Sequence, residues 1–191
     1  MSENKGEKLN RKTDIGSLRI GRNLTAAALL LLATGCQMNT SSTSEYLQQA
    51  QKALDAGNYP EALIATKNAL QQAPDNPDGR LILGELYLEA GQPEAALAEL
   101  QRAENNGIDT VRLLPLRARG LFDSGDYDRL IGLPLTEDAI AMLEAEDLAR
   151  IIALQGYAQL LRKNGTAART TFEKALALAP KTEIAVLGMV R

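Results

Sequence analysis

Apolar and small residues recur along most of the chain at the three- to four-residue spacing of an amphipathic helix. The pattern is clearest between Asp78 and Asp109, where two segments each have one apolar or small face: Leu81, Gly84 and Leu88, then Ala96, Leu100 and Ala103. Gly91 and Pro93 interrupt the pattern between the two segments, as expected of a tight turn. This stretch therefore predicts a helical hairpin, and two such short helices need neighbours to bury both of their faces.

Neighbouring stretches repeat the pattern with a constant period. Gly57, Gly91 and Gly125 are spaced by 34 residues, and small residues recur with the same period at two further positions: Ala62 and Ala96, and Ala69 and Ala103. A 34-residue period with small residues where helices cross closely resembles the signature of tetratricopeptide (TPR) repeats. We therefore expect an all-α fold, a TPR solenoid of antiparallel helix pairs, with about four repeats and the start of a fifth.

The register also predicts where the repeats are irregular. Pro115 lies in the first turns of the third repeat and predicts a late helix start or a kink. Ala96 and Ala168 are 72 residues apart, which is two periods plus four, so the third repeat carries a four-residue insertion, and Thr136 is placed to cap a helix that restarts within it. The other expected units are helices over residues 45–56 and 60–73, a fourth repeat over 149–182 and the start of a fifth over 184–191.

The N-terminal part of the chain has the pattern of a secretory signal. A basic segment ending in Arg22 precedes an apolar run over residues 24–32, which is much shorter than the roughly 20 residues that span a bilayer. The end of the run and the four residues after it form LATGC, residues 32–36, which resembles the bacterial lipobox. This resemblance implies that Cys36 is lipidated and anchors the protein to a membrane. Gln37 after the cysteine implies, by the same resemblance, an outer-membrane location facing the periplasm. The alternative is an ordinary signal peptide with an incidental thiol.

Three segments follow from these patterns. Residues 1–35 are predicted to be a lipoprotein signal peptide, residues 36–44 the lipidated cysteine and a flexible polar tether, and residues 45–191 the TPR-like solenoid. Each buried methylene of an acyl chain contributes about 0.8 kcal/mol, so several chains on one cysteine would hold the protein durably to a membrane.

Composition restricts the chemistry that the chain can perform. The 191 residues include no histidine and one cysteine, which excludes a Ser/His/Asp triad, a Cys/His pair and a His-ligated zinc ion. Residues 36–191 hold 15 Lys and Arg against 21 Asp and Glu, so this acidic part does not suit nucleic acid. The aspartates of DSGDYD, residues 123–128, lack the spacing of a calcium loop and are interpreted as part of a turn. We expect no enzyme activity, cofactor or metal site.

In TPR stacks the first helices of the repeats line a groove that receives a partner segment. The resemblance carries this role over to the matching positions of this sequence: Gln51, Leu54, Glu85, Leu88, Arg112, Arg119, Phe122, Arg150, Tyr157 and Leu160. The alternative for several of them is that they cover neighbouring repeats. Phe122 is the strongest candidate, because the only other phenylalanine, Phe172, falls on a repeat-packing position. Glu85 and Arg119 occupy equivalent positions, which favours an ion pair across the groove.

The order of lipobox, short Ser/Thr tether and repeats that include KNALQQAPDNPDGRLILGELYLEAGQPEAALAEL resembles the start of TPR-repeat lipoproteins found with exosortase/PEP-CTERM and exopolysaccharide systems. This resemblance implies a periplasmic scaffold with protein partners. Two alternatives are a pilotin-like or outer-membrane assembly lipoprotein, and the non-catalytic N-terminal part of a TPR-fused enzyme. No following helix covers the apolar residues Val186, Leu187, Met189 and Val190. We therefore expect the chain to be part of a longer repeat protein, and the alternative is that its end docks on another molecule.

Overall fold

A computed structural model describes residues 41–190, and this part of the chain is helical without any strand. Its ten helices are α2 (Thr43–Asp55), α3 (Tyr59–Gln72), α4 (Pro77–Glu89), α5 (Pro93–Asn105), α6 (Thr110–Asp123), α7 (Tyr127–Ile131), α8 (Glu137–Met142), α9 (Ala145–Leu161), α10 (Gly165–Leu178) and α11 (Glu183–Met189). The expected all-α fold is confirmed. The predicted signal peptide and Cys36 lie outside the described residues.

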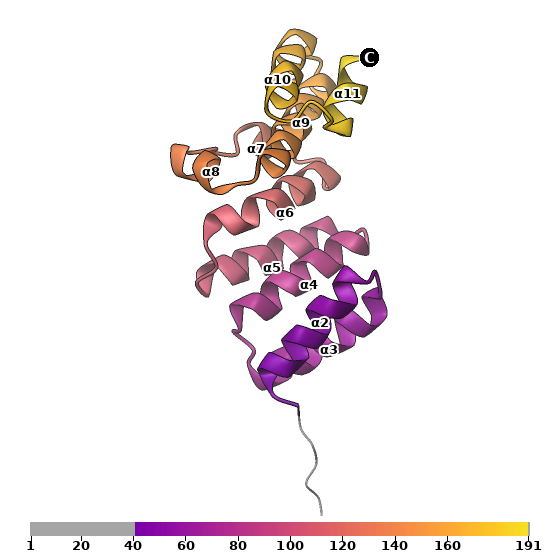
Figure 1. The fold of residues 1–191 in the computed structure, drawn as a ribbon, viewed down its shortest axis with the longest axis vertical. Coiled ribbons are helices and arrows are strands. Elements are labelled where there is room, and N and C mark those ends of the chain that lie inside the picture. Colours follow the sequence, from indigo (N-terminus) through magenta and orange to yellow (C-terminus); the bar gives the residue numbers. More distant parts are fainter. Residues whose placement is uncertain (1–40, 191) are drawn as a thin grey trace, which may run out of the picture. The chain divides into compact units, whose positions relative to one another are not determined.

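The helices pack in sequential pairs, as the 34-residue period predicts. Helices α2 and α3, α4 and α5, and α9 and α10 form antiparallel hairpins, and each pair packs on the next one along the chain (Figure 1). Helices α6 and α7 form a third, shorter pair, and α11 packs on both α9 and α10 in the place of a fifth first helix. None of the helices within residues 41–190 is long and apolar enough to cross a membrane.

Local sequence signals explain where the helices begin and end. Side chains of Ser42, Asn58, Asn76 and Asn164 accept hydrogen bonds from backbone N–H groups in the first turns of α2, α3, α4 and α10. The turns inside the first three pairs contain glycines with positive φ, Gly57, Gly91 and Gly125. In the fourth pair Lys163 takes the equivalent place with a φ of 63°, a backbone conformation that is strained for a residue with a Cβ atom.

Small residues allow the two helices of a pair to approach closely. Ala62, Ala96 and Ala168 are at most 1% exposed, each at the same position of its second helix. One turn further along, the equivalent positions hold Thr66, Leu100 and Phe172, which are also buried. The Thr66 hydroxyl is satisfied because it donates to the carbonyl of Ala62 at 2.7 Å. The predicted register of these three repeats is therefore confirmed.

The insertion in the third repeat shortens its second helix and adds a further one. Helix α7 ends at Ile131, and Thr136 caps α8 by accepting a hydrogen bond from the N–H of Ala139 at 3.2 Å. The restart predicted at Thr136 is confirmed. Gln155 on α9 donates to the carbonyls of Leu130 and Leu133 at 3.1 and 3.4 Å, which ties the end of α7 and the residues after it to α9. Helix α9 begins at Ala145, earlier than the predicted repeat boundary at residue 149.

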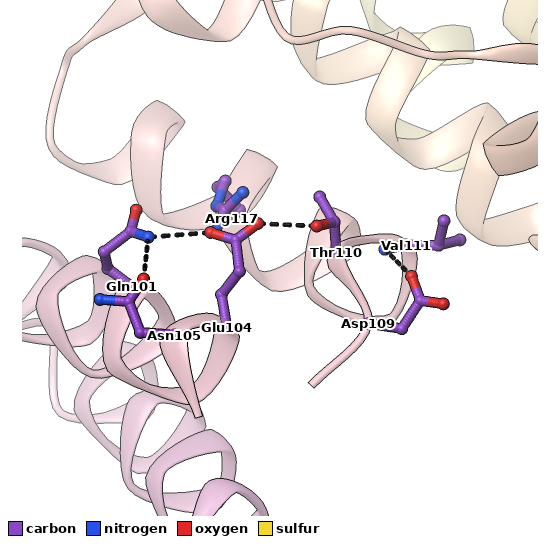
Figure 2. Close-up of polar contacts among 7 residues, drawn as sticks. All are labelled: Gln101, Glu104, Asn105, Asp109, Thr110, Val111 and Arg117. Carbon is purple, nitrogen blue, oxygen red and sulfur yellow. Dashed lines mark hydrogen bonds and ion pairs between the residues drawn. The ribbon is translucent and has the colours of Figure 1, made fainter. Parts of the chain in front are cut away.

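Pro115 lies in the interior of α6, the first helix of the third repeat. The sequence predicted either a late helix start or a kink at this proline. The helix starts at Thr110, so the late start is wrong, and the kink stays a prediction. A network centred on Glu104 of α5 fixes this start (Figure 2). The Glu104 carboxylate accepts hydrogen bonds from Arg117 at 2.8 Å and from the Thr110 hydroxyl at 2.7 Å, and Gln101 donates to it at 2.9 Å. The contacts with Thr110 and Arg117 join α5 to α6.

Helix α11 packs on the preceding pair around the ring of Phe172, with Ala185 buried in the same cluster. Phe172 of α10 is 1% exposed and lies between two glycines, Gly156 of α9 and Gly188 of α11. A Cβ atom on Gly156 would come within 2.7 Å of the ring, and one on Gly188 would come closer still. Both distances are shorter than any normal carbon contact, so the ring fills the space that the two missing side chains leave.

Candidate functional site

The first helices of successive repeats form one continuous layer, because α2 contacts α4, α4 contacts α6, α6 contacts α9 and α9 contacts α11. A groove of about 430 Å³ opens on this layer. All the residues that line it come from four of these helices: Glu85 of α4; Pro115, Leu116, Arg119, Phe122 and Asp123 of α6; Asp147, Arg150, Ile151 and Leu154 of α9; and Ile184 of α11. We name this feature the first-helix groove.

The cations of the groove are held by carboxylates. Arg119 donates from Nη1 to Oε1 of Glu89 at 2.6 Å, and its Nε lies 3.6 Å from Oδ2 of Asp123. Arg150 donates to Asp147 at 3.2 Å. The ion pair expected between Glu85 and Arg119 is therefore replaced by one with Glu89, which lies one helical turn beyond Glu85 on α4.

Glu85 lies among like charges. Burial raises the pKa of its carboxyl group, and the nearby carboxylates of Glu89 and Asp55 raise this pKa further, while Arg119 acts in the opposite direction. The Glu89 carboxylate differs because the Arg119 guanidinium donates to it, which lowers its pKa. Two neighbouring carboxylates on α4 are thus in opposite electrostatic environments.

Aromatic side chains extend from the groove into the core. The ring of Phe122 is 5.9 Å from that of Tyr127 and 6.4 Å from that of Tyr157, measured between centroids. The Tyr157 ring in turn meets the Phe172 ring at 5.2 Å and 73°, an edge-to-face arrangement. Phe122 therefore lines the groove with a ring that its neighbours hold in place.

The structure brings four of the ten predicted contact residues together in the groove: Glu85, Arg119, Phe122 and Arg150. Leu54 and Leu88 require a correction, because they are only 8% and 3% exposed. Leu54 packs in the core between α2 and α4, and Leu88 lies beside Gly120 of α6. Both side chains fill interfaces between repeats, where no partner segment reaches them.

The remaining four predicted residues also lie outside the groove lining. Gln51 and Arg112 are exposed and are engaged by neighbouring acids, Asp55 at 2.8 Å and Asp78 at 3.5 Å. Tyr157 and Leu160 pack against the core between α9 and α10. These four positions match the repeat pattern but have local partners in this chain.

Sequence reasoning missed most of the apolar lining of the groove. Pro115, Leu116, Ile151, Leu154 and Ile184 all line it. Pro115 was noticed only as an obstacle to the helix, whereas its ring faces the groove. The sequence did contain a signal for two of them. Ile151 and Leu154 lie within two turns of Arg150, a predicted groove residue, on the same helix.

The aspartates of the α6–α7 turn have structural partners. Asp126 caps α7 by accepting from the N–H of Arg129, Asp128 pairs with Arg162 at 3.0 Å, and Asp123 pairs with Arg119. This agrees with their interpretation as turn residues. Within residues 41–190 no group of three or more His, Cys, Asp or Glu side chains is arranged to hold a metal ion.

Comparisons with known proteins agree with this architecture. A tetratricopeptide repeat family model matches residues 53–119, which run from α2 into α6. The structure of pilF of Pseudomonas aeruginosa is similar, with a TM-score of 0.62 and 22% sequence identity. The match covers 77% of this chain and 65% of the pilF chain. No curated protein sequence matches this chain significantly.

Two further solved structures share the fold. MamA has a TM-score of 0.59 and 21% identity, with 77% of this chain and 78% of that one covered. YrrB, a TPR protein with an unusual peptide-binding site, has a TM-score of 0.66 and 20% identity over 89% of this chain and 86% of its own. The described residues thus have the TPR fold, which is that of protein–protein interaction scaffolds, and proteins of this kind are generally not catalysts.

Proposed function

We propose that this protein is a membrane-anchored scaffold that holds a segment of a partner protein in the first-helix groove. The observation that carries the proposal is the convergence of side chains from three successive repeats and α11 on one groove. A partner segment in this position contacts several repeats at once, so its affinity sums contributions from elements that are far apart in sequence.

The lining suits a polypeptide segment better than a small polar solute. Leu116, Phe122 and Ile184 provide apolar surface, and charged side chains lie beside them. Protein interfaces combine an apolar centre with a polar rim, and the volume of about 430 Å³ is at the scale of a few side chains.

The proposed cellular role is the assembly of exopolysaccharide export or PEP-CTERM protein-sorting machinery. This part of the proposal rests on the resemblance of the lipobox, tether and repeats to lipoproteins of those systems. Lipidation of Cys36 would place the solenoid in the periplasm at the outer membrane, with the polar residues after the cysteine as a tether.

Site-specific photocrosslinking in the native cells tests the proposal. A photoreactive amino acid is introduced at Leu116 in the groove and, as a matched control, at Ile64, an apolar residue of α3 that is 63% exposed. We expect crosslinks at position 116 to a protein of the export or sorting machinery, and none to that protein at position 64. The same adducts at both positions would contradict the groove, and a pilus or outer-membrane assembly partner would contradict the proposed cellular role.

A further inference from the structure

We infer that the first-helix groove selects partner segments in which a lysine or arginine lies beside apolar residues, and that the Glu85 carboxylate receives the cation. This inference deepens the proposed function and rests on it. It follows from three features of the groove: the pairing of its charges, the surroundings of Glu85 and the apolar surface next to them.

The charges of the groove leave one carboxylate in excess. Five ionisable side chains line it: Glu85, Arg119, Asp123, Asp147 and Arg150. Arg119 is bound by Glu89 and lies near Asp123, and Arg150 is bound by Asp147. Among the described residues Glu85 has no ion pair or hydrogen bond of its own. An acidic partner residue would have to displace an existing ion pair, whereas a basic one finds an open carboxylate.

The surroundings of Glu85 favour a cation further. Its carboxylate is half-buried and is repelled by Glu89 and Asp55, and within residues 41–190 Arg119 is the cation that opposes this repulsion. An ammonium or guanidinium group placed beside Glu85 would be attracted by all three carboxylates and would reduce the repulsion between them. Because the site is partly desolvated, such a contact is stronger than one between fully exposed charges.

The apolar lining specifies the neighbours of that cation. Pro115 and Leu116 lie on α6 together with Arg119 and Phe122, so the apolar surface continues along the same helix that faces Glu85. Lysine and arginine carry apolar stems that pack on such surface while their charged ends reach a carboxylate. The chemistry that fits is therefore a basic side chain flanked by apolar ones, in a segment that lies across α4, α6 and α9.

Selection from a random peptide library, displayed on phage and panned on the full chain, tests the inference. We expect enriched peptides to carry Lys or Arg next to apolar residues. Against a selected peptide, made synthetically, Glu85→Gln should raise Kd about tenfold, the order expected for a lost charge-assisted contact. Replacing the basic residue of the peptide by glutamine should cost the same factor with the wild type and nothing further with Glu85→Gln.

The matched control is Glu173→Gln on α10, an exposed glutamate outside the groove, which should leave Kd unchanged. Glu85→Gln nearly preserves shape and removes like-charge repulsion, so it should fold as well as the wild type. Enriched peptides without a basic preference, or equal affinity for wild type and Glu85→Gln, would overturn the inference.

A photoreactive form of the selected peptide separates this inference from the proposed function. Attachment mapped to α4, α6 or α9 supports the groove as the binding site. If the peptide attaches in the groove but its affinity does not depend on a basic residue, only the role of Glu85 is overturned. Attachment elsewhere, or no enriched peptide at all, overturns the groove and the inference together.

Discussion

Arg119 of α6 donates to Glu89 of α4 at 2.6 Å, across 30 residues of sequence. Tyr59 of α3 lies near the same carboxylate, which raises the pKa of the Tyr59 hydroxyl. Glu89 therefore has neighbours in both of the repeats that flank its own. Because each repeat contacts mainly the adjacent ones, such contacts contribute to cooperative unfolding of the array.

A double-mutant cycle with Arg119→Ala and Glu89→Ala measures this connection. We expect a coupling free energy of about 1 kcal/mol, because the pair is only partly exposed and its geometry is close. Urea unfolding of the four proteins provides the values. Arg169 and Glu173, a more exposed pair within α10, serve as the control and should show about 0.3 kcal/mol. Equal coupling in the two cycles would contradict the special role of the Arg119 pair.

The Glu104 network predicts a pH dependence. Hydrogen bonds, first from Arg117 and then from Thr110, lower the pKa of Glu104 below 4.5, so the native state holds its proton less tightly than the unfolded state. The stabilisation is fully present above pH 4.5 and is lost as the pH falls through the lowered pKa. Glu104→Gln should reduce the free energy of unfolding by about 1 kcal/mol at neutral pH.

Urea unfolding at a series of pH values checks this prediction. The difference between the wild type and Glu104→Gln should shrink as the pH falls below 4.5. Glu137→Gln, a change at an exposed residue of α8, provides the control for general acid effects. A constant difference across the whole range would show that the network does not stabilise the ionised carboxylate.

Lys163 is the one described residue other than glycine with positive φ. Lys163→Gly should raise the free energy of unfolding by about 1 kcal/mol, because glycine adopts this conformation without the Cβ clash. Thermal unfolding measures the change. Lys163→Ala keeps the Cβ atom and should leave stability near that of the wild type. If alanine stabilised the protein as much as glycine, the lysine side chain and not the backbone would be the source of strain.

Gly188 is predicted to be intolerant of even a methyl group. Gly188→Ala would bring a Cβ atom into steric overlap with the buried Phe172 ring, and displacing α11 or the ring should cost about 1–3 kcal/mol. Thermal unfolding is the measurement. Gly165→Ala is the control, because nothing lies within 4 Å of its Cβ position at the start of α10. Similar melting temperatures for the two variants would contradict the packing of Phe172 against α11.

The membrane anchor is tested through Cys36. Cys36→Ser should abolish incorporation of labelled fatty acid and release the protein from the membrane fraction, because the chain would lose its acyl groups. Metabolic labelling and fractionation of cells provide both readouts. Membrane association that persists in the variant, without label, would refute lipidation as the anchor.

The repeat period predicted most of the fold, because the helix crossings require small residues, and these recur at regular intervals in the sequence. Ala62, Ala96 and Ala168 show this directly, and each is buried where the register places it. The observed helix boundaries differ from the predicted ones by a few residues. Caps such as Ser42 and Asn58 act through local hydrogen bonds, which the periodicity of the sequence does not report.

The groove was harder to predict than the fold. Leu54 and Leu88 share the periodicity of groove residues, yet the packing of one repeat on the next covers them. The partner of Arg119 depends on which turn of α4 it faces, and repeat positions alone did not distinguish Glu85 from Glu89. Ile184 lies beyond the insertion, so its approach to α6 and α9 depends on how α7 and α8 are accommodated.

The contact between Phe172 and Gly188 also bears on the dynamics of the groove. Helix α11 has only seven residues, too few to persist alone, so it stays helical because it is docked on α9 and α10 through Gly188, Ala185 and Ile184. Transient undocking would expose its amides to hydrogen exchange and remove Ile184 from the groove wall. A segment bound against Ile184 would therefore slow exchange throughout α11, and binding at this site is thermodynamically linked to the folding of that helix.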